Sequence, residues 1–326
     1  MAMVDTRLTK DDLLARIRKR GPLTDPVMPG YSGSPLERAV LDDGTAVVIK
    51  HIDLGRDLAA IASNDRGRAA TLWLSGLLDR LPRSIDHATM AAWPEEGGWT
   101  LVMRDVSAAL IEESRVLTRD ESRRVLRQVA DYHRTLAGVQ HQDLCPLETH
   151  LSMFSPRSIA RLDQEAEIII AIKVGWRAFE RLAPAAIREA VLRLQSDPRP
   201  LAEALRSRGT TLVHGDLWFS NLGLLEDGLV ILDWSLATAA PGALDFALFL
   251  LGNSAAIDAT RDEIVRDYQA VCGDAFDRAA LDLGLLGAFV EYGWLLANGE
   301  EHGWDEGALA WWLDAISPAL GRLPAA

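Results

Sequence analysis

Residues 212–221 read LVHGDLWFSN, and residues 230–234 read VILDW. Short apolar runs of this kind are typical of buried strands, and we expect strands over residues 210–213 and 229–233. Polar side chains follow both runs, at His214, Asp216, Asn221 and Asp233. A hairpin of this size would bring the two strand ends together. We therefore expect Asp216, Asn221 and Asp233 to point at one place.

These three side chains suit the transfer of a phosphoryl group. That reaction needs a divalent ion on the phosphate oxygens and an acceptor hydroxyl held in line. Mg²⁺ prefers hard oxygen ligands, which the Asn221 amide and the Asp233 carboxylate offer. A second carboxylate, at Asp216, can orient the hydroxyl and take its proton.

The pattern His-Gly-Asp-Leu-Trp-x-x-Asn followed by Ile-Leu-Asp-Trp resembles the catalytic and metal loops of the aminoglycoside phosphotransferase family, which shares the protein-kinase-like fold with choline kinases and their relatives. The resemblance implies a protein-kinase-like α+β fold, with a small antiparallel-sheet N-lobe and a larger, mainly helical C-lobe. It implies ATP as the phosphoryl donor, with GTP as the alternative, and Mg²⁺ as the metal. It also implies that His214 and Asp245 support the site structurally.

The resemblance extends to a nucleotide site in the first lobe. Lys50 ends the apolar run Val47–Lys50, where the family's lysine meets the nucleotide phosphates. Residues 30–34 correspond to the loop over the phosphates, and residues 101–106 resemble the hinge beside the adenine. The further nucleotide-binding candidates are Ser32, Gly33, Ser34, Met103, Arg104 and Val106.

One departure from the pattern concerns the partner of Lys50. Kinase-like folds place a glutamate on the small-lobe helix to pair with this lysine. The expected position falls at residues 66–69, which read Arg-Gly-Arg-Ala, and the nearest acid is Asp65. Either Asp65 replaces the glutamate, or Lys50 meets phosphate without a carboxylate partner, or the site is impaired.

The remaining pattern predicts two lobes, over residues 1–105 and 106–326. In the first, we expect a helix over residues 9–20, then a small antiparallel sheet within residues 22–104 with one helix over residues 66–81. In the second, the apolar spacing predicts helices over residues 119–137, 164–181 and 185–195, with Thr118 as the N-cap of the first. From residue 244 onward the chain reads as mostly helical.

Composition narrows the class of partner. The chain has 326 residues and a net charge of −13, which disfavours nucleic acid because the phosphate backbone would be repelled. Two cysteines in this length indicate a reducing, cytoplasmic compartment. The sequence has no run of about 18 apolar residues, so no membrane span is expected. It leaves the oligomeric state open.

Acidic residues near the C-terminus are weak candidates for binding a small-molecule acceptor. They are Glu291, Glu300, Glu301 and Asp305. They either attract an aminated, aminoglycoside-type substrate or form a solvated face. A second His-x-Asp, at His141–Asp143, lacks the downstream asparagine, and with Cys145 and His150 it fits no standard zinc spacing.

Several functions remain open beside an aminoglycoside-type kinase. The acceptor can be another small metabolite of choline-, homoserine-, sugar- or nucleoside-like chemistry. The missing glutamate is also compatible with a nucleotide-binding regulator of impaired catalysis. The third hypothesis is a helical interaction protein without nucleotide binding.

Overall fold

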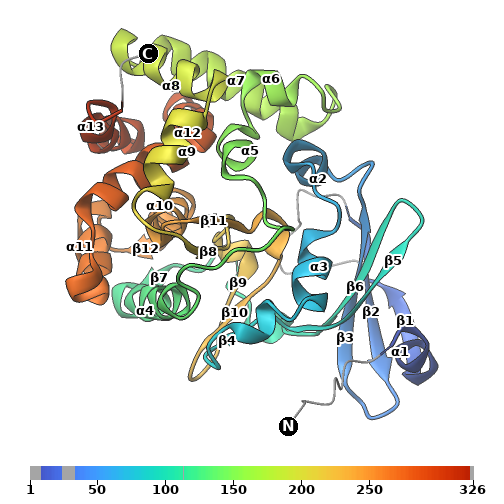
Figure 1. The fold of residues 1–326 in the computed structure, drawn as a ribbon. Coiled ribbons are helices and arrows are strands. Elements are labelled where there is room, and N and C mark those ends of the chain that lie inside the picture. The colour runs from blue at the N-terminus through green and yellow to red at the C-terminus, as the bar shows by residue number, and fades with distance from the viewer. Residues whose placement is uncertain (1–8, 24–33, 113, 324–326) are drawn as a thin grey trace.

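The computed structural model describes residues 9–23, 34–112 and 114–323. A five-stranded antiparallel sheet forms the first part of the chain, with the strand order β1-β2-β3-β6-β5. Its strands are β1 (Ile17–Pro22), β2 (Leu36–Leu41), β3 (Ala46–Asp53), β5 (Thr89–Glu95) and β6 (Gly98–Arg104). Helix α1 (Lys10–Arg16) lies on one side of the sheet, and α3 (Arg68–Leu74) lies on the other (Figure 1).

The alternation of side chains along β3 explains how one face of the sheet packs on α1 while the other face carries Lys50. Val47 and Ile49 are buried in a small core with Leu13 of α1. Because successive strand residues point to opposite faces, Lys50 belongs to the other face, which is the side of α3. The sheet therefore turns Lys50 toward the C-terminal part of the molecule, where it reaches Asp233.

Two expectations for this region were wrong. The helix expected over residues 9–20 ends at Arg16, because residues 17–22 pair with β2 as the edge strand β1. The single helix expected over residues 66–81 is broken. Within that range α3 ends at Leu74, Gly76 takes the left-handed conformation at φ +78°, and a 3₁₀ turn, Leu78–Arg80, follows. A separate helix, α2 (Leu58–Ser63), precedes α3.

The second part of the chain is mainly helical, and a long apolar helix runs through its core. Its helices are α4 (Arg119–Thr135), α5 (Leu147–Ser152), α6 (Pro156–Ile159), α7 (Glu167–Leu182), α8 (Ala185–Ser196), α9 (Arg199–Arg206), α10 (Gly242–Asn253), α11 (Arg261–Cys272), α12 (Arg278–His302) and α13 (Ala308–Leu320). Three of the expected helices are confirmed in α4, α7 and α8, and Thr118 caps α4 in a capping box with Glu121. Helix α12 is long and apolar enough to cross a membrane, but 89% of its most apolar stretch is buried inside the protein.

Short strands tie the two parts together and position the loops between them. Strand β4 (Ile85–Asp86), from the first part, pairs with β10 (Leu229–Ile231), which pairs in turn with β9 (Leu222–Leu224). Strand β8 (Thr211–Val213) pairs with β11 (Thr238–Ala240), and β7 (Leu117–Thr118) pairs with β12 (Ile257–Asp258). Strands β8 and β10 precede the candidate residues and confirm the two expected strands. The two strands do not pair with each other.

Candidate functional site

The loop after β8 is held in place because its backbone N–H groups donate hydrogen bonds to a buried carboxylate. His214 and Gly215 donate their backbone N–H groups to the two carboxylate oxygens of Asp245, each at 2.8 Å. Gly215 has φ +83°, and a Cβ there would lie 2.6 Å from the Leu236 carbonyl oxygen, so the turn requires glycine. The turn places Asp216 at the open end of the loop, where its side chain is half-buried.

His214 connects this loop to the strand that precedes Asp233. Its Nε2 donates to the Leu232 carbonyl at 2.8 Å, and its Nδ1 accepts the Asp216 backbone N–H at 3.1 Å. The ring is fully buried, and burial lowers the pKa of His214. A neutral histidine with Nε2 protonated satisfies both contacts, so His214 fixes the distance between the two loops.

Asp245 lies in the first turn of α10 and is fully buried. Besides the two backbone N–H groups, it accepts hydrogen bonds from Tyr132 and from His133 Nε2, the latter at 3.0 Å. Burial works to raise the pKa of Asp245, but the His133 hydrogen bond and charge outweigh it and hold the pKa below its usual value. This carboxylate holds the backbone of the loop that carries Asp216.

Asp216 and Asn221 are in direct contact. The Asn221 amide nitrogen donates to the Asp216 carboxylate at 2.8 Å and to the Asp216 carbonyl at 2.9 Å. Burial, followed by the nearby charge of Asp233, raises the pKa of Asp216 to about 7. The carboxylate can therefore gain and lose a proton near neutral pH, as a general base must.

Asp233 follows β10 and faces Lys50. Its φ of +58° lies in the left-handed region, which aspartate tolerates better than most residues. Its carboxylate accepts a hydrogen bond from Lys50 Nζ at 2.8 Å. Burial works to raise the pKa of Asp233, but the Lys50 charge outweighs it and lowers the pKa to about 2. The carboxylate is thus ionised and available to a cation.

The donor set at this point fits Mg²⁺. Because the Asn221 amide nitrogen is held by Asp216, its oxygen is free to face a ligand. That oxygen and the ionised Asp233 carboxylate are the hard ligands that Mg²⁺ takes in nucleotide sites, with the remaining positions filled by phosphate and water.

The three side chains come together by a different route from the one expected. The hairpin is formed by β9 and β10, whereas β8 pairs with β11. Residues Phe219–Asn221 form a 3₁₀ turn directly before β9, which carries Asn221 across to Asp216. The contacts from His214 to Leu232 and from Asn221 to Asp216 replace the strand pairing that the sequence suggested.

Asp65 does not replace the missing helix glutamate. Its carboxylate accepts the backbone N–H groups of Gly67 and Arg68 and lies 3.9 Å from the Arg68 guanidinium. Lys50 pairs instead with Asp233. Burial works to lower the pKa of Lys50, but the charge of Asp233, joined by that of Asp57, outweighs it and raises the pKa. Asp57 caps α2, and nothing in the sequence marks it except that it precedes a helix.

Of the other nucleotide candidates that the structure describes, Ser34 precedes β2, and Met103, Arg104 and Val106 lie at or just after the end of β6. Ser34 Oγ donates to the Asp57 carboxylate at 3.3 Å, whereas Ser32 and Gly33 lie outside the described residues. In the expected hinge, Met103 and Arg104 end β6, and the Arg104 backbone N–H is bonded to the Ala88 carbonyl. Val106 follows at the start of a 3₁₀ turn.

Of the acidic acceptor candidates, Glu291 lies close enough to Asp216 for that charge to act on it, whereas Glu300, Glu301 and Asp305 lie at and beyond the C-terminal end of α12. Glu291 is fully buried on α12, with its carboxylate 3.4 Å from His150 Nε2, and burial raises its pKa. On the surface, Glu301 pairs with Arg181, and Asp305 pairs with Arg261. Glu300 accepts the backbone N–H of Gly307 at 3.2 Å.

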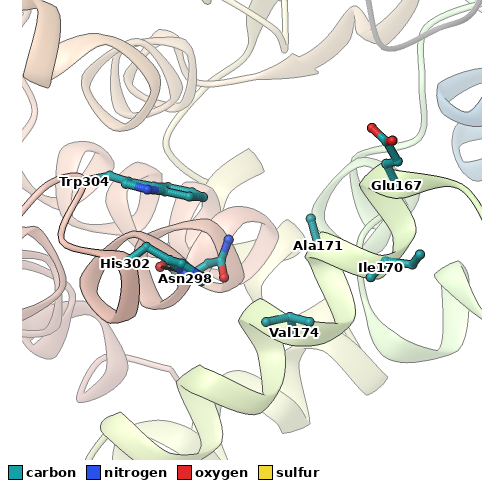
Figure 2. Close-up of a pocket in the computed structure, with 7 residues that line it drawn as sticks. All are labelled: Glu167, Ile170, Ala171, Val174, Asn298, His302 and Trp304. Carbon is teal, nitrogen blue, oxygen red and sulfur yellow. Dashed lines mark hydrogen bonds between the residues drawn. The ribbon is translucent and has the colours of Figure 1, made fainter.

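Two hollows lie near these acids. One, of about 270 Å³, lies between α7 and the end of α12, and Figure 2 shows Trp304 above Asn298 and opposite Val174 there. The other, of about 290 Å³, is lined by Asp305 and by residues at the start of α11. Asp216, Asn221 and Asp233 line neither hollow.

The second His-x-Asp has few potential metal ligands gathered around it among the described residues. His141 Nδ1 lies 3.8 Å from the Asp143 carboxylate, and Cys145 is buried with its backbone bonded to Ala237. Within the described ranges, no group of three or more His, Cys, Asp or Glu side chains is arranged to hold a metal ion.

Comparison with known proteins agrees with the geometry. The sequence model described as the phosphotransferase enzyme family matches residues 38–283. No curated protein matches the chain.

Solved structures show what the chain is similar to in fold. The choline kinase LicA from Streptococcus pneumoniae is 13% identical, with a TM-score of 0.54 and 95% of each chain covered. LicA in complex with AMP is 14% identical, with a TM-score of 0.53 over 94% of this chain and 93% of that one. An aminoglycoside phosphotransferase from Alicyclobacillus acidocaldarius is 13% identical, with a TM-score of 0.49 over 98% of this chain and 96% of that one. The two LicA structures show that the chain has a protein-kinase-like fold.

Proposed function

Because the chain belongs to the phosphotransferase enzyme family and is a small-molecule kinase, we propose that it moves the γ-phosphoryl group of ATP to a hydroxyl group of its acceptor beside Asp216. The observation that supports this proposal is the convergence of Asp216, Asn221 and the Lys50–Asp233 pair at one point. LicA, a solved protein of the same fold, holds AMP.

Each of these residues has its own role in the proposed reaction. Asp216 accepts the proton of the acceptor hydroxyl, and the Asn221 amide keeps its carboxylate in place. Lys50 exchanges part of its contact with Asp233 for the phosphate oxygens, which it attracts as a point charge. Asp245 and His214 keep the loop rigid, so that the base does not move during the transfer.

Asn221 and Asp233 are the residues that would hold Mg²⁺. When bound, the ion neutralises charge on the phosphate oxygens of the donor. The ionised state of Asp233, held by Lys50, keeps this position ready for a cation.

An aminoglycoside-type acceptor is the substrate class that we propose first, supported by the net charge of −13. The assignment of Glu300, Glu301 and Asp305 to that acceptor stays a prediction, since arginines already offset the charges of Glu301 and Asp305. Choline-, homoserine-, sugar- and nucleoside-like acceptors are the alternatives within the class. We place the protein in the cytoplasm on its two free cysteines.

Incubation with γ-labelled ATP, Mg²⁺ and a panel of these hydroxylated compounds tests the proposal. Label is expected to move to at least one compound in the wild type and not in Asp216→Ala. Asp143→Ala is the matched control, because it removes the aspartate of the second His-x-Asp and should transfer normally. Undiminished transfer by Asp216→Ala would remove Asp216 from the mechanism. Replacing ATP with GTP in the same assay decides the donor.

Thermal shift with ATP separates the kinase from a regulator of impaired catalysis. A kinase should be stabilised by the nucleotide more strongly with Mg²⁺ than without it. A regulator should respond weakly and without dependence on the metal, and a helical interaction protein should not respond at all.

A further inference from the structure

An arginine, Arg68, falls within residues 66–69, where the sequence pattern placed the glutamate of kinase-like folds. Arg68 is the first residue of α3, and only 5% of it is exposed. Gly67, at φ +98°, precedes it, and a Cβ there would collide with the Trp99 ring at 2.0 Å. The glycine therefore lets the chain turn sharply enough to direct Arg68 inward.

The Arg68 guanidinium donates to backbone carbonyls from three segments. Its Nε donates to Asp143 at 2.9 Å, ahead of α5, and its Nη2 donates to Ser63 at 3.5 Å, at the end of α2. Its Nη1 donates to the carbonyl of Ser235, two residues after Asp233. A guanidinium is suited to this use, because its donors fan out in one rigid plane.

The Ser235 carbonyl belongs to the segment that carries Asp233. Residues Trp234–Leu236 form a 3₁₀ turn directly after Asp233, whose backbone is left-handed, and α2 and α3 pack against this turn. The carbonyl of the next residue, Leu236, lies against the Cα of Gly215. A displacement of this turn would therefore shift Asp233 and would also loosen the backbone that presents Asp216.

We propose that Arg68 is a positioning residue for the segment 233–236, and that it couples the small-lobe helix to Asp233 through backbone carbonyls instead of through a lysine–glutamate pair. Lys50 is then free to pair with Asp233 itself. Since it takes Asp233 as a metal ligand, this inference rests on the proposed function.

Hydrogen exchange tests the positioning without metal or nucleotide. Arg68→Met removes the donors, and Arg68→Lys keeps the charge but lacks the planar fork. The backbone amides of residues 233–238 are expected to exchange faster in Arg68→Met and to an intermediate degree in Arg68→Lys. Leu72→Ala, which opens a cavity one turn further along α3 and leaves the Arg68 donors in place, is the control for general loss of stability. If Arg68→Met does not fold, Arg68→Lys carries the comparison.

Calorimetric titration of ADP at increasing Mg²⁺ concentration gives the second readout. Loss of an outer-shell partner typically weakens metal binding about 10- to 100-fold. The Mg²⁺ concentration for half-maximal enhancement of ADP binding should rise by about this factor in Arg68→Met and less in Arg68→Lys, and it should stay unchanged in Leu72→Ala.

The outcomes distinguish a failure of the proposed function from a failure of the positioning role of Arg68. A wild type whose ADP binding ignores Mg²⁺ contradicts the proposed function. A wild type that depends on Mg²⁺, with Arg68 variants that match Leu72→Ala in both exchange and metal dependence, overturns the role of Arg68 alone.

Discussion

The loop region of residues 214–245 and the C-terminal helices both carry acidic side chains, but they hold them differently. In the loop region, Asp216 and Asp233 are partly exposed and point toward one place, and the buried Asp245 holds the loop from behind. On the C-terminal helices, Glu291 is buried beside a neutral histidine, and Glu301 is tied to an arginine on the surface. The difference teaches that acidic charge marks a site only where the backbone brings the carboxylates together.

The largest expected effect is on catalysis. Asp216→Ala should lower kcat by about 10²–10⁴-fold, the usual contribution of a positioned general base, without a matching loss of stability. Asp143→Ala should leave kcat within about twofold of the wild type, since alanine keeps the backbone carbonyl that accepts Arg68 and the lost carboxylate faces His141. Steady-state kinetics with any accepted substrate gives both values. A similar fall in both variants would break the distinction between the two His-x-Asp motifs.

The next effect is on stability. Asp245→Ala leaves two buried backbone N–H groups, Tyr132 and His133 without their acceptor. Removing one partner of a buried charged network costs about 3–5 kcal/mol, so urea denaturation should show a loss of that size. A loss below about 1 kcal/mol would mean that the loop holds its shape without Asp245.

A smaller, pH-dependent effect is expected at Glu291. Burial raises the pKa of Glu291 above that of the unfolded chain, so the folded state binds a proton that the unfolded state releases as pH rises above about 4.5. The wild type thus loses stability from this group as pH rises, and Glu291→Gln does not. The gain in Tm for Glu291→Gln should therefore be larger at pH 8 than at pH 5. A gain that is largest at pH 5 would contradict a protonated Glu291.

The smallest effect is expected at the surface acids. Glu301→Gln should change the unfolding free energy by less than about 1 kcal/mol, because Glu301 forms an exposed ion pair with Arg181. It should also change KM for an aminoglycoside by less than about threefold, since the arginine already offsets the charge. A much larger rise in KM would return this acid to the acceptor site and narrow the contrast between the two regions.

The sequence predicted what depends on local spacing. The short strands before Asp216 and Asp233 and the capped helix α4 could be read from apolar runs, a capping threonine and the residues between them. The family pattern predicted the two-lobed, protein-kinase-like fold. The strands and the capped helix are set by residues close together in the chain, and the fold was predicted because the pattern matched a known family.

What the sequence missed depends on contacts between distant residues. The strand β1 could not be told from a helical continuation, because only its pairing with β2 makes it extended. Arg68 looked like a missing glutamate, since its three carbonyl partners come from three other segments. Glu301 and Asp305 looked free, since their arginines lie 120 and 44 residues away in the chain.

The most direct measurement is a crystal structure with Mg²⁺ and a non-hydrolysable ATP analogue. A metal ion should appear about 2.0–2.1 Å from the Asn221 side-chain oxygen and an Asp233 carboxylate oxygen, with Lys50 in contact with a phosphate. An analogue bound elsewhere, with Lys50 and Asp233 still paired only to each other, would contradict the account.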